Sequence, residues 1–110
     1  MQQDKVLSML GLAKRAGRIC SGAPQCEKVI KSGKSELIII AKDISENGRK
    51  AITDCCSYYK VNYIEYSDMY ALSDAIGAEG VRAVVSVNDK SFADAILKKY
   101  VNVQSERKGE

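Results

Sequence analysis

Apolar residues near the start of the chain recur every three or four positions, which is the spacing of one helix face. The pattern runs from Val6 to Ala13 and stops at Ala16-Gly17, where a glycine is a typical helix end. It predicts a helix, followed by a short strand at residues 18–20. A second helix should start near Ala23 and end at Ser32-Gly33.

The middle of the chain holds five consecutive apolar residues, Leu37 to Ala41. A run without polar alternation is typical of a strand covered on both faces, so we expect it to be central in a sheet. Ser45 can cap a helix that reaches about Tyr59. The remaining predicted elements are a strand at residues 61–66, a helix from Ser67 or Asp68 to residues 76–77, a strand at residues 82–87, and a helix from Asp89 to about Tyr100.

Strands that alternate with helices indicate a layered α/β domain. A chain of 110 residues fits one domain, which we expect at residues 1–102, with residues 103–110 as a polar, flexible tail. No run approaches the roughly 18–20 apolar residues of a membrane helix, and the N-terminus lacks the pattern of a signal peptide. We therefore predict a cytoplasmic protein without a membrane partner.

Charge is distributed unevenly along the chain. Residues 1–60 hold 11 Lys or Arg against 6 Asp or Glu, whereas residues 61–110 hold 6 against 8. The positive field therefore belongs to the first half, which favours a local binding site for a polyanion over diffuse attraction. The candidate cations around the second helix are Lys14, Arg15, Arg18, Lys28 and Lys31. The alternative is an ordinary solvated helix face.

The start of the second predicted helix has the chemistry of an RNA contact. Gly22 suits a helix cap, and Pro24 is tolerated in the first turn, where an N–H has no intrahelical partner to lose. Free N–H groups and the positive end of the helix dipole can receive phosphate oxygens. Gln25 carries an amide that can both donate to and accept from a base edge. Together these residues predict a structured RNA as the partner.

Four cysteines raise the question of a metal site or of disulfides. Cys20 and Cys26 are separated by five residues and Cys55 and Cys56 are adjacent, which is not the short ligand spacing of a zinc site. The chain also contains no histidine. We therefore expect no metal and no cofactor, and we interpret the cysteines as small core residues in a reducing compartment.

Enzymatic activity is not indicated by the residue types present. The chain has no histidine for acid–base chemistry, no Gly-Lys-Ser/Thr phosphate loop and no obvious nucleophile paired with a base. Asp43 and Asp89 follow predicted strands, where α/β folds place catalytic groups. Both are better interpreted as helix caps, so we predict that the protein is not an enzyme.

Four blocks of sequence in a fixed order carry a family resemblance. They are LGLAKRAGRICSG, then IKSGKSELIIIAKD, then KVNYIEY, and finally SDAIGAEGVRAVVSV. In this order they resemble the kink-turn RNA-binding proteins related to the archaeal ribosomal protein L-seven-Ae, and most closely the bacterial YlxQ-type branch. The resemblance covers roughly residues 4–100. It implies a three-layer α/β/α sandwich around a four-stranded mixed sheet, a monomer, and an association with the ribosome or translation.

The resemblance also implies roles for individual residues. Gly22 matches a glycine of close approach, Gln25 a contact to sheared G·A pairs, and Lys28 a phosphate-binding lysine. The loop before the last strand matches a second contact, which packs on a flipped-out nucleotide; its residues are Ala78, Glu79, Gly80, Val81 and Arg82. Core packing remains an alternative for Val81, and an exposed strand-end charge remains one for Arg82.

One position departs from the family pattern, and one rival function remains. Many members have an asparagine where this chain has Pro24, which lacks both a side-chain amide and an N–H, so a base-specific contact is in question. The rival is a protein-interaction module of the translation apparatus with weak or no kink-turn specificity. It would dock through residues 55–63, where Tyr58, Tyr59 and Tyr63 cluster.

Overall fold

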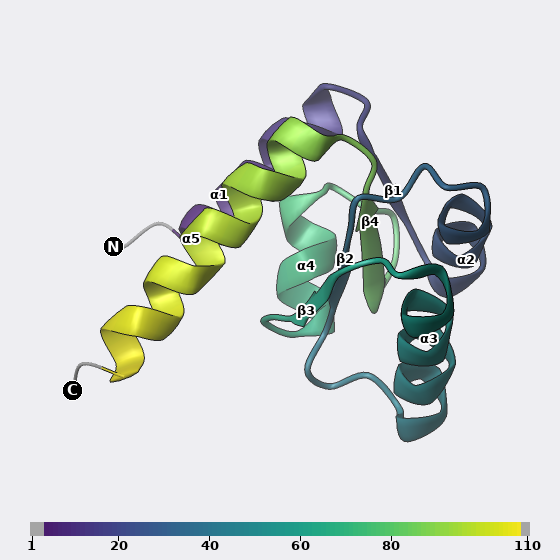
Figure 1. Ribbon diagram of the computed structural model, residues 1–110. Helices are drawn as coiled ribbons and strands as arrows, with labels where there is room; N and C mark the ends of the chain where they lie inside the picture. Colours follow the sequence, from purple (N-terminus) through teal and green to yellow (C-terminus); the bar gives the residue numbers. More distant parts are fainter. Residues whose placement is uncertain (1–3, 109–110) are drawn as a thin grey trace.

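The computed structural model describes residues 4–108, with side chains as far as residue 102, and shows helices and strands in alternation (Figure 1). Helices and strands fall close to the predicted ranges. In chain order they are α1 (Lys5–Arg15), β1 (Ile19–Ser21), α2 (Ala23–Lys31), β2 (Leu37–Ile40), α3 (Glu46–Tyr59), β3 (Tyr63–Glu65), α4 (Met69–Ala75), β4 (Val84–Val87) and α5 (Lys90–Lys108).

The four strands form one mixed sheet in the order β1-β4-β2-β3. β4 runs antiparallel to both β1 and β2, whereas β2 and β3 are parallel. In this register Ile39 lies opposite Val85 on one side and Ile64 on the other. All four residues of β2 are buried, so the prediction of a central, fully covered strand is confirmed.

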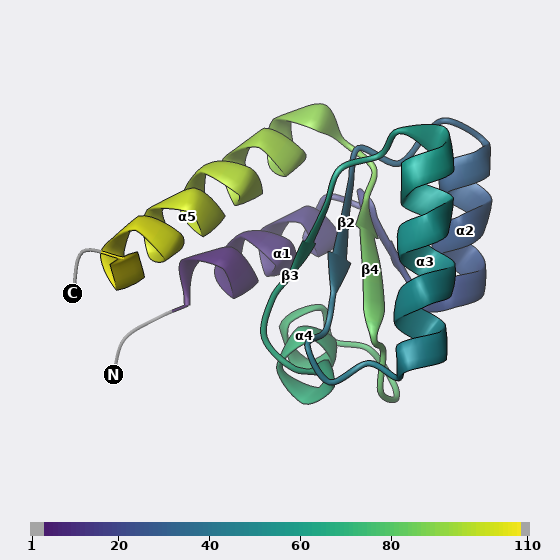
Figure 2. The same ribbon diagram turned by 60° about the horizontal axis from the view of Figure 1, so that its bottom comes forward.

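Helices cover both faces of the sheet, which confirms the predicted α/β/α sandwich (Figure 2). Because successive strand residues point to opposite faces, Leu37 and Ile39 pack in the cluster with α1, α4 and α5. Ile38 and Ile40 pack in the other cluster with α2 and α3. β2 therefore contributes side chains to the core on both faces of the sheet.

Close packing of α1 on α4 depends on Gly11. A Cβ at this position would lie 3.2 Å from the carbonyl oxygen of Ala75, which is tighter than ordinary contact. α1 also packs along α5, and the two helices lie side by side in both views (Figures 1 and 2). No helix within residues 4–108 is both long and apolar enough to cross a membrane.

Two predicted boundaries were wrong for identifiable reasons. β4 begins at Val84 and not at residue 82, because both backbone groups of Arg82 bond to the hydroxyl of Ser73 on α4. α5 continues to Lys108 where an end near Tyr100 was expected, since no glycine or proline interrupts the sequence before Gly109. Of the predicted tail, residues 103–108 continue this helix and residues 109–110 lie outside the described part.

Candidate nucleic-acid interface

Gly22 forms the turn between β1 and α2. Its N–H donates to the carbonyl oxygen of Val84 (2.9 Å), and its own carbonyl accepts from the N–H of Cys26 (2.9 Å). Its φ of 92° lies in a region that side-chain-bearing residues rarely adopt. The sequence therefore needs glycine here both to finish the sheet and to start the helix.

α2 differs from the other helices at its N-terminus. A side-chain oxygen of Asp4, Ser45, Asp68 or Asp89 accepts a first-turn N–H of α1, α3, α4 and α5, respectively. At α2 the N-cap is Gly22, and no side chain makes this bond. The N–H groups of Ala23 and Gln25 therefore face outward without an intrahelical acceptor, at the positive end of the helix.

The loop at residues 78–82 lies against this helix start. Ser73 holds the loop by accepting from the Arg82 N–H (2.6 Å) and donating to the Arg82 carbonyl (3.3 Å). A Cβ on Gly22 would lie 3.9 Å from Cδ of Arg82, and one on Gly80 would lie 3.7 Å from an Arg82 guanidinium nitrogen. Arg82 thus bridges the two segments that the family resemblance implied.

The residues of this loop differ in exposure. Glu79 and Gly80 are exposed, whereas Ala78 packs against the α1/α4/α5 core. Val81 is 48% exposed, which contradicts the alternative of core packing for this residue. Arg82 is half-buried against Gly22 and does not extend freely from a strand end. An apolar side chain and a guanidinium are therefore presented together beside the start of α2.

The basic residues are spread over a longer surface than their sequence spacing suggested. Lys28 is exposed and lies one turn beyond Gln25, about 4.5 Å along the axis. Lys31 is in the last turn of α2. Lys14, Arg15 and Arg18 precede β1, so β1 separates them from Gly22. Arg18 Nε also lies 3.8 Å from the carboxylate of Asp89.

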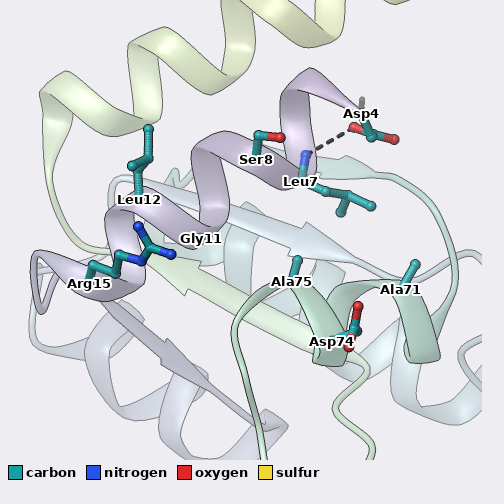
Figure 3. A pocket seen from close by; sticks show the side chains of 9 residues that line it. All are labelled: Asp4, Leu7, Ser8, Gly11, Leu12, Arg15, Ala71, Asp74 and Ala75. Carbon is teal, nitrogen blue, oxygen red and sulfur yellow. Dashed lines mark hydrogen bonds between the residues drawn. The ribbon is translucent and has the colours of Figure 1, made fainter. Parts of the chain in front are cut away.

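Arg15 faces a groove between α1 and α4, in the opposite layer from α2 (Figure 3). The groove has a volume of about 630 Å³ and mixes apolar walls, such as Leu7 and the half-exposed Leu12, with the carboxylate of Asp74. The residues between Gly22 and Gln25 take no part in it. Arg15 is therefore placed on a different surface from Gly22 and Gln25.

Two cations that were not predicted as contacts, Lys42 and Arg49, lie at the same edge of the sheet as Gly22. β2 ends beside the start of β4, and the chain then continues through Lys42 and Asp43 into α3. Arg49 donates to the carboxylate of Glu65 and to the Lys42 carbonyl, and the hydrogen bond to Glu65 raises the pKa of Arg49. The placement of Lys42 could have been predicted from the sequence, because a cation that directly follows a central strand lies at the edge of the sheet where that strand ends.

The predicted caps are found with one difference. Asp89 caps α5 through the Phe92 N–H, as expected. Asp43 accepts from the N–H of Met69 (3.0 Å), so it bonds the first residue of α4, while Ser45 caps α3. Asp43 therefore ties the exit of β2 to a later helix.

The four cysteines lie in or beside the core between the sheet and α2/α3, and the prediction that they are core residues is confirmed for Cys26 and Cys56. All four are free thiols; Cys26 and Cys56 are buried, and burial raises the pKa of Cys56 to about 11. A hydrogen bond with Cys26 lowers the pKa of Cys20 to about 6, and the same bond raises that of Cys26. No group of three or more His, Cys, Asp or Glu side chains in the described part of the chain is placed to hold a metal ion.

Comparison with known proteins bears on this arrangement. A family model described as the Ribosomal protein L7Ae/L30e/S12e/Gadd45 family matches residues 4–97. The chain belongs to this family. It is 38% identical over 89 residues to the RNA-binding protein YlxQ of Bacillus subtilis (strain 168), covering 81% of this chain and 88% of the relative. It is 32% identical over 91 residues to the RNA-binding protein YlxQ of Enterococcus faecium, covering 83% and 86%.

Solved structures share the fold. A protein with unknown function from Bacillus halodurans C superposes with a TM-score of 0.84 at 30% identity, covering 88% of this chain and 97% of that one. The Giardia lamblia 15.5kD RNA binding protein superposes with a TM-score of 0.75 at 21% identity, covering 92% and 86%. The family model and the relatives show the family of this chain, and the solved structures show the same fold.

Proposed function

We propose that this protein binds structured RNA, and that it recognises a kinked stem through Gly22–Gln25 and the loop at residues 78–82. The observation that carries the proposal is the juxtaposition of the uncapped start of α2 with this loop, bridged by Arg82. It occurs in a chain whose family relatives, at 38% and 32% identity, are named RNA-binding proteins.

Each part of the surface fits a different feature of a kinked RNA. The N–H groups of Ala23 and Gln25, with Lys28 one turn further, suit phosphate oxygens. The amide of Gln25 suits a base edge, which a protein reaches only where the RNA departs from a regular A-form helix. The exposed Val81 suits the face of an extruded base. Pro24 keeps the helix start rigid but offers no donor.

A titration tests the proposal. One labelled RNA contains a kink-turn, and a second has its sheared G·A pairs replaced by Watson–Crick pairs. We expect tighter binding to the first RNA, and we expect Gln25→Ala to reduce the discrimination by ~1–3 kcal/mol, a typical value for a lost base-edge contact. Equal affinity of the wild-type protein for both RNAs would contradict kink recognition.

Association with the ribosome or with translation belongs to the same proposal. It is supported by the family, which includes ribosomal proteins by its description. Sedimentation of a cell lysate at low and high salt tests it. We expect the protein in ribosomal fractions at low salt and its release as salt rises, because phosphate contacts weaken with ionic strength. Absence from those fractions at low salt would limit the proposal to a free RNA target.

A further inference from the structure

The C-terminal end of α3 exposes aromatic side chains, away from Gly22. Tyr58 is 79% exposed, and Tyr59 and Tyr63 are each 41% exposed. The rings of Tyr58 and Tyr59 meet edge to face with their centroids 4.9 Å apart. A pair of rings held in this way offers preformed flat surfaces to a ligand.

Tyr63 belongs to the same surface. Side chains alternate along β3, so Tyr63 and Glu65 share a face, and Glu65 bonds to Arg49 near the start of α3. α3 returns the chain from the end of β2 to the start of the parallel strand β3, so it runs opposite to β3 (Figure 2). Tyr63, at the start of β3, therefore lies toward the end of α3, where Tyr58 and Tyr59 are.

Cations border these rings. Lys60 follows Tyr59 directly and caps α3 with a left-handed backbone, φ 59°. α2 packs along α3, and the positive charge of Lys31 acts on the thiol of Cys55, one turn before Tyr59. Burial and the charge of Glu27 still raise the pKa of Cys55 overall. Lys31, in the last turn of α2, is thus near Cys55 on the neighbouring helix.

Lys60 occupies a position where glycine is the usual residue. A left-handed conformation is strained for a residue with a Cβ, and helices commonly end on glycine or asparagine for this reason. Here the cap is made by backbone bonds, in which the Lys60 N–H bonds the Ser57 carbonyl and the Val61 N–H bonds the Cys56 carbonyl. The cap bonds involve only backbone atoms, so the lysine side chain is not needed for them.

We propose that Tyr58, Tyr59 and Lys60 bind an unpaired RNA segment that adjoins the kinked stem. Aromatic rings stack on bases of any sequence and lysines neutralise the phosphates between them, which is the usual chemistry of single-strand binding. α2 has nine residues, so its last turn, which borders this surface, lies about 13 Å along the helix axis from Gly22, or roughly four duplex steps of 3.4 Å. The inference rests on the proposed function, because one RNA contacts both surfaces.

The experiment compares a kink-turn RNA with the same RNA carrying an oligouridine extension at its 5′ or its 3′ end. We expect one of the extensions to tighten binding about tenfold, within the range measured for stacking of a base on an aromatic ring. The double variant Tyr58→Ala with Tyr59→Ala should lose this gain and keep the affinity for the unextended RNA. Tyr70→Ala is the matched control, because Tyr70 is 75% exposed on α4.

Lys60→Asn separates charge from structure. Asparagine tolerates the left-handed conformation better than lysine, so this variant should unfold at the same or a higher temperature while it binds the extended RNA more weakly. If Lys60 had a structural role instead, Lys60→Asn should lower the unfolding temperature and leave the affinity for the extended RNA unchanged. If Lys60→Asn leaves the affinity for the extended RNA unchanged, Lys60 is not part of the surface and the proposal is wrong as stated.

Binding of oligouridine without a kink-turn separates a failure of this inference from a failure of the proposed function. The chain has six tyrosines and no tryptophan, so quenching of tyrosine fluorescence reports binding directly. Binding that depends on Tyr58 and Tyr59 supports the inference even where kink-turn discrimination fails. If neither extension adds affinity, or if the double variant behaves as the wild type with every RNA, the inference is overturned and a protein partner is the remaining occupant.

Discussion

The aliphatic part of Arg82 lies over Gly22, with its Cδ 3.9 Å from the place where a Cβ would stand. The two residues come from opposite halves of the chain and meet because β1 pairs with β4. The Gly22 N–H bond to Val84 fixes the same junction. A change at either residue should therefore affect the helix start and the loop together.

Gly22→Ala should destabilise the protein by ~1–3 kcal/mol, because alanine is strained at a φ of 92°. The free energy of unfolding in urea measures this. Gly33→Ala is the control, since Gly33 also has a positive φ (79°) but open space around it. Both variants should lose stability, and only Gly22→Ala should also lose RNA affinity. An equal loss of affinity in both would count against the site.

Ser73→Ala should cost ~1–3 kcal/mol of stability, because it leaves the Arg82 N–H without its partner in a half-buried place. The loop at residues 78–82 should loosen, so RNA affinity should also fall. Ser8→Ala, at an exposed position of α1, should change stability by less than about 0.5 kcal/mol. Thermal unfolding and the RNA titration check both results. Unchanged affinity in Ser73→Ala would show that the loop contributes no contact.

Lys28→Gln should reduce the steepness with which log affinity falls with log salt by about one unit, as expected for one lost phosphate contact. Lys98→Gln is the matched control, because Lys98 is exposed on α5, in the opposite layer. Its slope should equal that of the wild type. Titrations over a series of salt concentrations supply the slopes, and two identical slopes would remove Lys28 from the site.

Pro24→Asn should tighten binding to a kink-turn RNA about tenfold, because it restores an amide at a place where many family members have one, and one hydrogen bond is worth about this much. Pro24→Ala restores only the backbone N–H and serves as the control. If both variants gain equally, the backbone N–H was the missing contact. If neither gains, the family's asparagine contact has no counterpart here.

Cys20 should ionise near pH 6, because Cys26 donates to its thiolate. Above this pH the native protein has lost a proton that the unfolded chain keeps until about pH 8.5. Since stability rises with pH wherever the unfolded state binds more protons, the free energy of unfolding should increase from about pH 6 to 8.5 through this group. The rate of alkylation by iodoacetamide against pH checks the ionisation.

Cys26→Ala is the informative variant for this prediction. Without the Cys26 hydrogen bond, the pKa of Cys20 should return toward that of an ordinary cysteine, and alkylation at pH 7 should slow. Cys56 should react slowly in both proteins, because its buried thiol stays protonated. An unchanged pH profile in Cys26→Ala would refute the thiol pairing.

Much of the fold followed from local patterns in the sequence. The spacing of Val6, Leu10 and Ala13 predicted α1, and the unbroken apolar run predicted β2. Both predictions succeeded because burial of one or two faces of an element sets the spacing of its apolar residues. Ser45 and Asp89 marked helix starts for an equally local reason. The order of the strands in the sheet could not be predicted from these local patterns, because it depends on packing between segments that are distant in the sequence.

The candidate site was only partly predictable for the same reason. Gly22 and Pro24 predicted the start of α2. The loop at residues 78–82 was predicted as a contact only through the family resemblance. The cations at residues 14–34 looked like one patch in the sequence, but α2 carries Lys31 away from Gly22, and β1 separates Arg18 from it. Short distance along a chain that reverses direction does not mean a shared surface.

The packing of α1 against α5 has a consequence for synthesis on the ribosome. The buried face of α1 is closed by Ala93 and Ile96 of α5, which is translated after the other helices and strands of the described domain. While α5 is still in the exit tunnel, α1, which emerges earlier, lacks part of its apolar partner surface. We therefore expect the sheet with α2 and α3 to form earlier and the domain to close only after α5 has left the tunnel. Newly made chains should be most exposed to proteases and chaperones in that interval.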